Sequence, residues 1–191
     1  MQAGLAPQNT LVVVNQQSLE SMEVGNDYRA ARGIPAVNVC PITVPPCVAG
    51  FPATYSIGTN EFLTLIRTPI TNHLARYGLT NQIDAIVFMM DIPYRVNESN
   101  GLTAAMFYGY KTSQASPMAP DTTNTYFAAE RAFSRRDRTN DYYLSFLLTG
   151  WTLADAKALI DRSVSADYTA PSGTVYLMKG PDPWRNIRYP Q

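Results

Sequence analysis

The residues with the clearest capacity for chemistry stand where apolar runs end. Asp91 directly follows the apolar run 83–90 and Arg95 comes soon after it, so a carboxylate and a guanidinium could meet at that point. Asn15 and Lys179 end two other apolar runs. These side chains could hold a polar ligand, or Asp91 could cap a turn and pair with Arg95 in a structural role. We therefore treat Asn15, Asp91, Arg95 and Lys179 as ligand-binding candidates.

Other residue patterns give no catalytic or metal site. His73 is the only histidine and falls inside a predicted helix, where packing is the usual role of a lone histidine. Structural zinc needs about four His or Cys ligands, and the chain has one His and two Cys. We find neither the Asp-rich spacing of an EF-hand nor a glycine-rich phosphate motif or G-x-S-x-G elbow. The sequence thus predicts no catalytic residue, no metal and no cofactor.

The two cysteines bear on the cellular compartment. Cys40 and Cys47 flank a short stretch with three prolines. In an exported protein such close cysteines are expected to form a disulfide, which stabilises mainly by restricting the unfolded chain. The alternative is one buried thiol on a strand and one incidental thiol in a loop. Their spacing is not Cys-x-x-Cys, so a redox motif is not indicated.

Composition restricts the partners. Fifteen basic residues balance fifteen acidic ones, and only 16% of residues are charged, against about 25% in a typical soluble domain. Nucleic acid and anionic membranes both favour a basic excess, so neither is expected as a partner. No apolar run approaches the roughly 20 residues of a membrane-spanning helix. Low charge with many Tyr, Pro, Asn, Thr and Ser is typical of exported proteins, and we expect an extracellular, cell-surface or periplasmic location, although the first ten residues lack the features of a signal peptide.

The elements that must position these residues alternate between strands and helices. Apolar runs at 11–14, 37–43, 83–90, 143–148 and 174–178 predict five strands. Capping residues and apolar periodicity predict helices at 19–31, 59–77 and 153–164, with Pro69 kinking or splitting the second near Arg67. We therefore predict one α/β domain over 1–191, a three-layer α-β-α sandwich with a mostly parallel sheet of about five strands. The strand 83–90 should lie at its centre.

A long insertion follows the third predicted strand. Residues 97–140 show no regular pattern apart from an expected helix within 125–133, and 181–191 reads as an extended tail. Connections longer than about 15 residues usually have a function or a structure of their own. The insertion contains several aromatic residues and arginines, and Tyr is enriched at protein interfaces. The aromatic residues could equally anchor the insertion onto its own domain, and the arginines could form a solvated helix face. The interface candidates are Tyr108, Tyr110, Tyr126, Phe127, Arg135 and Arg136.

Three segments carry a resemblance to a known family. They are LVVVNQQSLESMEVGNDYRAARGIPAVNVC, EFLTLIRTPITNHLARYGLTNQIDAIVFMMDIPYRV, and YYLSFLLTGWTLADAKALIDRSV with the following GTVYLMKG. Together they resemble the amino-terminal half of an uncharacterised bacterial family of exported proteins found in species with the exosortase surface-sorting system. The resemblance brings no known catalytic motif, and it implies export and display at the cell surface.

A more distant likeness is to cysteine peptidases of the gingipain and caspase type. That fold is also a helix-sheet-helix sandwich, with the catalytic His and Cys after two neighbouring strands. The matching strand ends here carry Asp91 and Thr149-Gly150, so no His/Cys dyad can form. Two hypotheses follow: a non-catalytic exported domain that binds or assembles with other proteins or with its own copies, which the sequence favours, and a hydrolase-related domain lacking the dyad.

Overall fold

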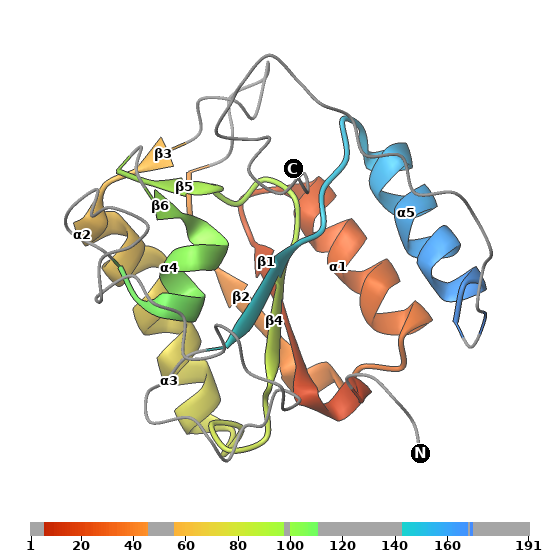
Figure 1. Ribbon diagram of the computed structural model, residues 1–191, viewed down its shortest axis with the longest axis horizontal. Coiled ribbons are helices and arrows are strands. Elements are labelled where there is room, and N and C mark those ends of the chain that lie inside the picture. The colour runs from red at the N-terminus through yellow and green to blue at the C-terminus, as the bar shows by residue number, and fades with distance from the viewer. Residues whose placement is uncertain (1–5, 46–55, 98–99, 111–142, 168, 170–191) are drawn as a thin grey trace, which may run out of the picture.

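Four parallel strands form the central sheet of this protein (Figure 1). The structure is a computed structural model that describes residues 6–45, 56–97, 100–110, 143–167 and 169. The strands are β1 (Thr10–Asn15), β2 (Val39–Ile42), β4 (Ala85–Phe88) and β7 (Leu144–Leu147). Their order is β2-β1-β4-β7, and all three neighbouring pairs are parallel. The prediction of a mostly parallel sheet is confirmed.

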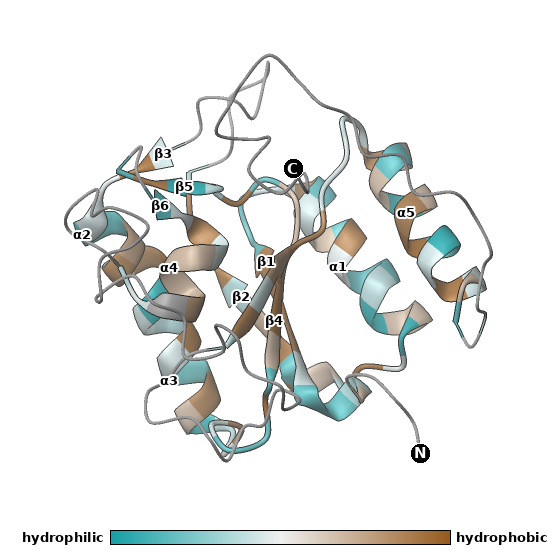
Figure 2. Ribbon diagram, viewed as in Figure 1, coloured by the Kyte–Doolittle hydropathy of each residue, from teal (hydrophilic) through white to brown (hydrophobic). Residues whose placement is uncertain are grey.

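The two inner strands are buried on both faces. Every residue of β1 and β4 is buried, as expected for runs without charged residues in a parallel sheet covered by helices. Figure 2 shows β4 and the middle of β1 as hydrophobic, between helices with mixed surfaces. Side chains alternate between the two faces, so Val13 and Phe88 pack into one core, whereas Val12 and Val87 pack into the other. The predicted central position of 83–90 is confirmed.

Two helices cover the second of these faces. Helix α1 (Leu19–Ala31) begins at Ser18, whose side chain accepts a hydrogen bond from the Ser21 backbone N–H, and α5 (Leu153–Ser165) begins at Thr152, which forms a capping box with Asp155. Both predicted helix starts are confirmed. The two helices lie side by side (Figure 1). They are linked by ion pairs from one lysine to two acidic residues: Lys157 with Glu23 and Asp27.

One long, irregular helix covers the other face. It consists of α2 (Thr59–Glu61), a π-helical part (Phe62–Arg67) and α3 (Thr68–Arg76). Pro69 lacks an N–H, and its ring would clash with the preceding turn of an α-helix. The helix therefore widens just before Pro69, where the Thr68 N–H bonds to the Leu63 carbonyl. The kink or split that the sequence predicts near Arg67 is replaced by a π-helical segment, Phe62–Arg67, that ends there.

A small second sheet and a short helix follow the central strand. The sheet contains β3 (Ser56–Ile57), β5 (Arg95–Val96) and β6 (Asn100–Gly101), and α4 (Leu102–Tyr108) continues from it. Our expectation of chain without regular pattern from residue 97 is wrong for β6 and α4. Leu102, Ala105 and Met106 bury one side of α4 in the same core as α3. Two residues per strand and seven in the helix are too few for a pattern to be recognised in the sequence.

The layers define an α/β sandwich with helices on both faces of the sheet. The fifth predicted strand, 174–178, lies outside the described residues, as do the expected helix within 125–133 and the tail 181–191. None of the helices in the described part of the chain has the length and apolar character needed to cross a bilayer.

Candidate functional site

The carboxyl ends of β1 and β4 meet at one edge of the sheet, where ligands bind in many proteins of this architecture. Asn15 ends β1 and is fully buried. Its Nδ2 donates to the Asp91 carbonyl oxygen at 3.0 Å, and its Oδ1 accepts from the backbone N–H groups of Gln17 (3.1 Å) and Val44 (3.3 Å). Its own backbone N–H donates to Ser21 Oγ at 2.9 Å. Asn15 thus ties β1 to the ends of both neighbouring strands and to α1.

Asp91 is held by the first turn of α1. Ser18 Oγ donates to Asp91 Oδ2 at 2.5 Å and accepts from the Ser21 backbone N–H at 3.0 Å. Asp91 has a φ of 59°, a left-handed conformation that costs a non-glycine residue free energy and persists only when neighbours hold it. The bonds from Asn15 and Ser18 supply that constraint.

These bonds favour a structural role for the buried part of the candidate site. Asn15 is 0% exposed and Ser18 is 6% exposed, and hydrogen bonds inside the chain engage both side chains. Buried polar groups with complete hydrogen bonding stabilise a fold, and a ligand would have to displace existing partners. The expectation that Asn15 and Asp91 lie close together agrees with the structure. The sequence indicated Ser18 only as a helix cap and gave no sign of the role of Ser21.

The other two ligand-binding candidates are Arg95 and Lys179. Arg95 is exposed on β5, and its guanidinium carbon lies 5.5 Å from the centroid of the Tyr94 ring, within the range of a cation–π contact. Lys179 lies outside the described residues.

Only two of the interface candidates lie in the described part of the chain. Tyr108 is the last residue of α4. Tyr110 is half-buried against the core that α3 and α4 share, and its hydroxyl accepts a hydrogen bond from Asn97 Nδ2 at 2.9 Å. This placement supports the alternative in which the aromatic residue anchors its own segment. The other four, Tyr126, Phe127, Arg135 and Arg136, lie outside the described residues.

His73 takes part in packing on the outer side of α3. Its Nε2 donates to the Val37 carbonyl oxygen at 2.8 Å, and its ring centroid lies 4.7 Å from that of Tyr77. It borders an open groove of about 500 Å³ between α3 and the edge strand β2, whose wall includes Pro41 and Arg76. The contacts agree with the expected packing role.

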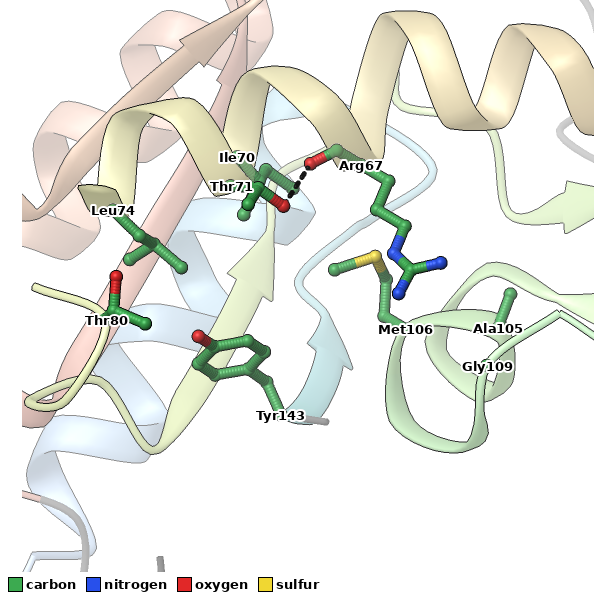
Figure 3. Close-up of a pocket in the computed structure, with 9 residues that line it drawn as sticks. All are labelled: Arg67, Ile70, Thr71, Leu74, Thr80, Ala105, Met106, Gly109 and Tyr143. Carbon is green, nitrogen blue, oxygen red and sulfur yellow. Dashed lines mark hydrogen bonds between the residues drawn. The ribbon is translucent and has the colours of Figure 1, made fainter. Parts of the chain in front are cut away.

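A second, smaller cavity lies between α3, α4 and the start of β7 (Figure 3). Its volume is about 40 Å³, enough for one or two waters and too little for a metabolite. Arg67 lines it near Met106, and Thr71 Oγ donates to the Arg67 carbonyl oxygen at 2.9 Å. Among the described residues no group of three His, Cys, Asp or Glu side chains could hold a metal ion.

Cys40 is buried on β2 with 1% of its surface exposed. Burial raises the pKa of its thiol to about 12, since the thiolate would lose its hydration. Within the described residues Cys40 has no disulfide partner. Cys47 lies outside them, so the disulfide stays a prediction.

In a Cys47→Ser variant, we expect native Cys40 to resist alkylation near neutral pH and to react fully in urea, because the reactive thiolate is both covered and disfavoured. Its raised pKa also makes stability pH-dependent. The thiol of the unfolded chain ionises near 9, so the contribution of Cys40 is complete below that pH and falls as pH rises toward 12, by about 1.4 kcal/mol per pH unit. Mass spectrometry of the alkylated protein is the measurement. Labelling of native Cys40 as fast as that of a small free thiol would contradict the expected resistance to alkylation.

The two edges of the main sheet differ in how they are protected. On β2, Gln16 N–H bonds to the Ile42 carbonyl, so alternation turns Ile42 toward β1 and Pro41 outward. Proline has no N–H and blunts a sheet edge. On β7, Leu144 and Leu148 donate to carbonyl oxygens of Asp84 and Phe88, so alternation turns the backbone groups of 145 and 147 outward.

The β7 edge is apolar and exposed. Phe146 is 48% exposed and Leu147 is 38% exposed, and Trp151, just beyond the strand, is 75% exposed. No charged residue occurs from 142 to 154. No strand pairs with the outer side of β7 in the described part of the chain. Sequence reasoning missed this surface because the run looks like any buried strand until the strand order is known.

Comparison of the chain with models of protein families, with curated proteins and with solved structures finds no match in any of the three.

Proposed function

We propose that this chain is a non-catalytic, exported domain that binds other proteins through the outer edge of β7. The observation that supports it most directly is an edge strand with outward backbone groups, exposed Phe146 and Leu147, and no protecting charge or proline. Such an edge is a template for another strand. Because Pro41 blunts the opposite edge, the β7 edge is the better binding surface.

The polar edge of the sheet supports the same proposal. A ligand-binding site needs convergent polar groups that are available to the ligand. At the ends of β1 and β4, Asn15 and Ser18 are committed to bonds with Asp91 and with backbone groups. Three exposed apolar residues, Phe146, Leu147 and Trp151, lie together on β7 and just beyond it, which favours a protein partner over a polar metabolite.

A hydrolase-related domain is the second candidate, and one observation favours it. The strained φ of Asp91 lies at the end of a central strand whose neighbour is β7, and strained residues cluster at active sites. An enzyme of this kind would hydrolyse ester or amide substrates, and Asp91→Asn would abolish the turnover while leaving the thermal midpoint nearly unchanged. Equal, background-level rates for the wild type and the variant would set this candidate aside.

The native mass of the protein from the cells that make it tests the binding function. We expect size-exclusion chromatography with light scattering to give a species heavier than 21.1 kDa, with denaturing mass spectrometry identifying its components. Ser145→Pro, which removes one outward N–H of β7, should return the chain to monomeric mass. A wild-type monomer under these conditions would contradict the proposal.

A further inference from the structure

The connection after β7 restricts what can cover its outer edge. Helices α1 and α5 pack on the same face of the sheet, and the connection from β1 through α1 leads to β2, away from β7. Connections between parallel strands are right-handed in about 98% of cases. A right-handed connection from β7 through α5 therefore leads back toward β4, where the neighbouring position is already filled. A parallel strand added beyond β7 by the same chain would need the rare left-handed connection.

This restriction makes a parallel strand from the segment after α5 a poor partner for the outer edge of β7, and the absence of charge from 142 to 154 favours a second copy. We propose that the outer edge of β7 pairs in antiparallel fashion with β7 of a second copy, joining two four-stranded sheets across a two-fold axis. The inference rests on the proposed binding function and names the partner. An isologous contact needs a surface that is complementary to itself. The stretch 142–154 meets this condition because it carries no charge that would face its own copy.

The positions of the outward groups set the register. Ser145 Oγ donates to the Tyr143 carbonyl oxygen at 2.9 Å, so the outward backbone groups left for a partner begin at Ser145. With the axis beside Phe146, Ser145 of one copy lies opposite Leu147 of the other, and each such pair exchanges two backbone hydrogen bonds. The Phe146 side chains of the two copies then lie directly opposite each other, where cross-strand aromatic pairs are favourable.

The interface is small, which sets the expected strength. Only 144–147 form the strand, and interfaces below about 1,200 Å² belong to weak or transient complexes. We therefore expect a monomer–dimer equilibrium that depends on concentration. Sedimentation equilibrium of the purified chain, from micromolar to near-millimolar concentration, measures it.

A charge exchange at Phe146 provides the decisive test. Phe146→Lys and Phe146→Glu each place like charges face to face and should weaken the dimer by about tenfold or more, whereas an equimolar mixture of the two should recover dimers. Leu19→Lys, at a residue 79% exposed on α1, is the matched control and should leave the dimer unchanged. Ser145→Pro, which removes an outward N–H without removing a bond to β4, is a second disrupting variant. Circular dichroism confirms that each variant is folded.

The outcomes separate this inference from the proposed function. Dimers lost in the single-charge variants and recovered in their mixture support the two-fold pairing. A purified chain that stays monomeric at every concentration, or dimers that Phe146→Lys leaves intact, overturn it. If the purified chain is monomeric while the species from the source cells contains a different protein, the second copy is the wrong partner and the binding function stands. A monomer in both preparations overturns both.

Discussion

Replacing Asn15 by Ala is expected to lower the free energy of unfolding by about 2–3 kcal/mol. The substitution leaves three groups without their partner: the Asp91 carbonyl and the N–H groups of Gln17 and Val44. Each buried polar group that loses its partner costs about 1–3 kcal/mol. Val44 and the Asn15 site are fully buried, so water cannot easily replace the amide. Urea unfolding followed by circular dichroism measures the change.

Two further variants show whether the side-chain amide is the cause. Asn72→Ala, at an exposed position on α3, should change stability by less than about 0.5 kcal/mol. Asn15→Asp keeps an oxygen for the two N–H groups but loses the donor to Asp91. Because the new carboxyl group could donate again once it is protonated, we expect the deficit of this variant relative to the wild type to shrink as pH falls and to grow as pH rises. Equal stability of Asn15→Ala and the wild type would show that the network is dispensable.

The order of the main-sheet strands and of the three longer helices was predictable because parallel sheets with helical cover leave strong local signals. Unbroken apolar runs mark buried strands, and caps at Ser18 and Thr152 mark helix starts. The buried face of α1 was not predictable. Leu19 is 79% exposed, while Ser21 and Gly25 are buried, because the helix approaches the sheet through small residues, which give no hydrophobic periodicity.

For the candidate site, only the proximity of residues at the ends of neighbouring strands was predictable. Parallel strands end at the same edge of a sheet, so the proximity of Asn15 and Asp91 followed from their positions. Whether such a polar residue binds a ligand or the protein itself depends on partners that come from distant segments, such as Ser18. Predicting the exposed surface of β7 requires knowledge of the strand order, since Phe146 is exposed only because no described strand lies beyond it.

Gly25→Val is expected to destabilise the protein by about 3 kcal/mol or more, at the limit of typical overpacking costs. Gly25 lies in the buried face of α1, and a Cβ at this position would come within 2.3 Å of Val14 Cγ1 and 3.5 Å of Met89 Cγ. The glycine is therefore a close-contact residue that lets the helix pack onto β1, and this contact outweighs the roughly 1 kcal/mol that a helix loses by having glycine in its interior.

A change of size at the facing residue distinguishes this contact from a backbone effect. Val14→Ala removes the atom that a new Cβ would meet, so Gly25→Ala should cost clearly less in the Val14→Ala background than in the wild type. Ala30→Val, at an exposed position of the same helix, controls for the helix propensity of valine and should cost well under 1 kcal/mol. If Gly25→Ala costs the same in both backgrounds, the helix does not need glycine for its approach to Val14. The cost would then come from another part of the helix.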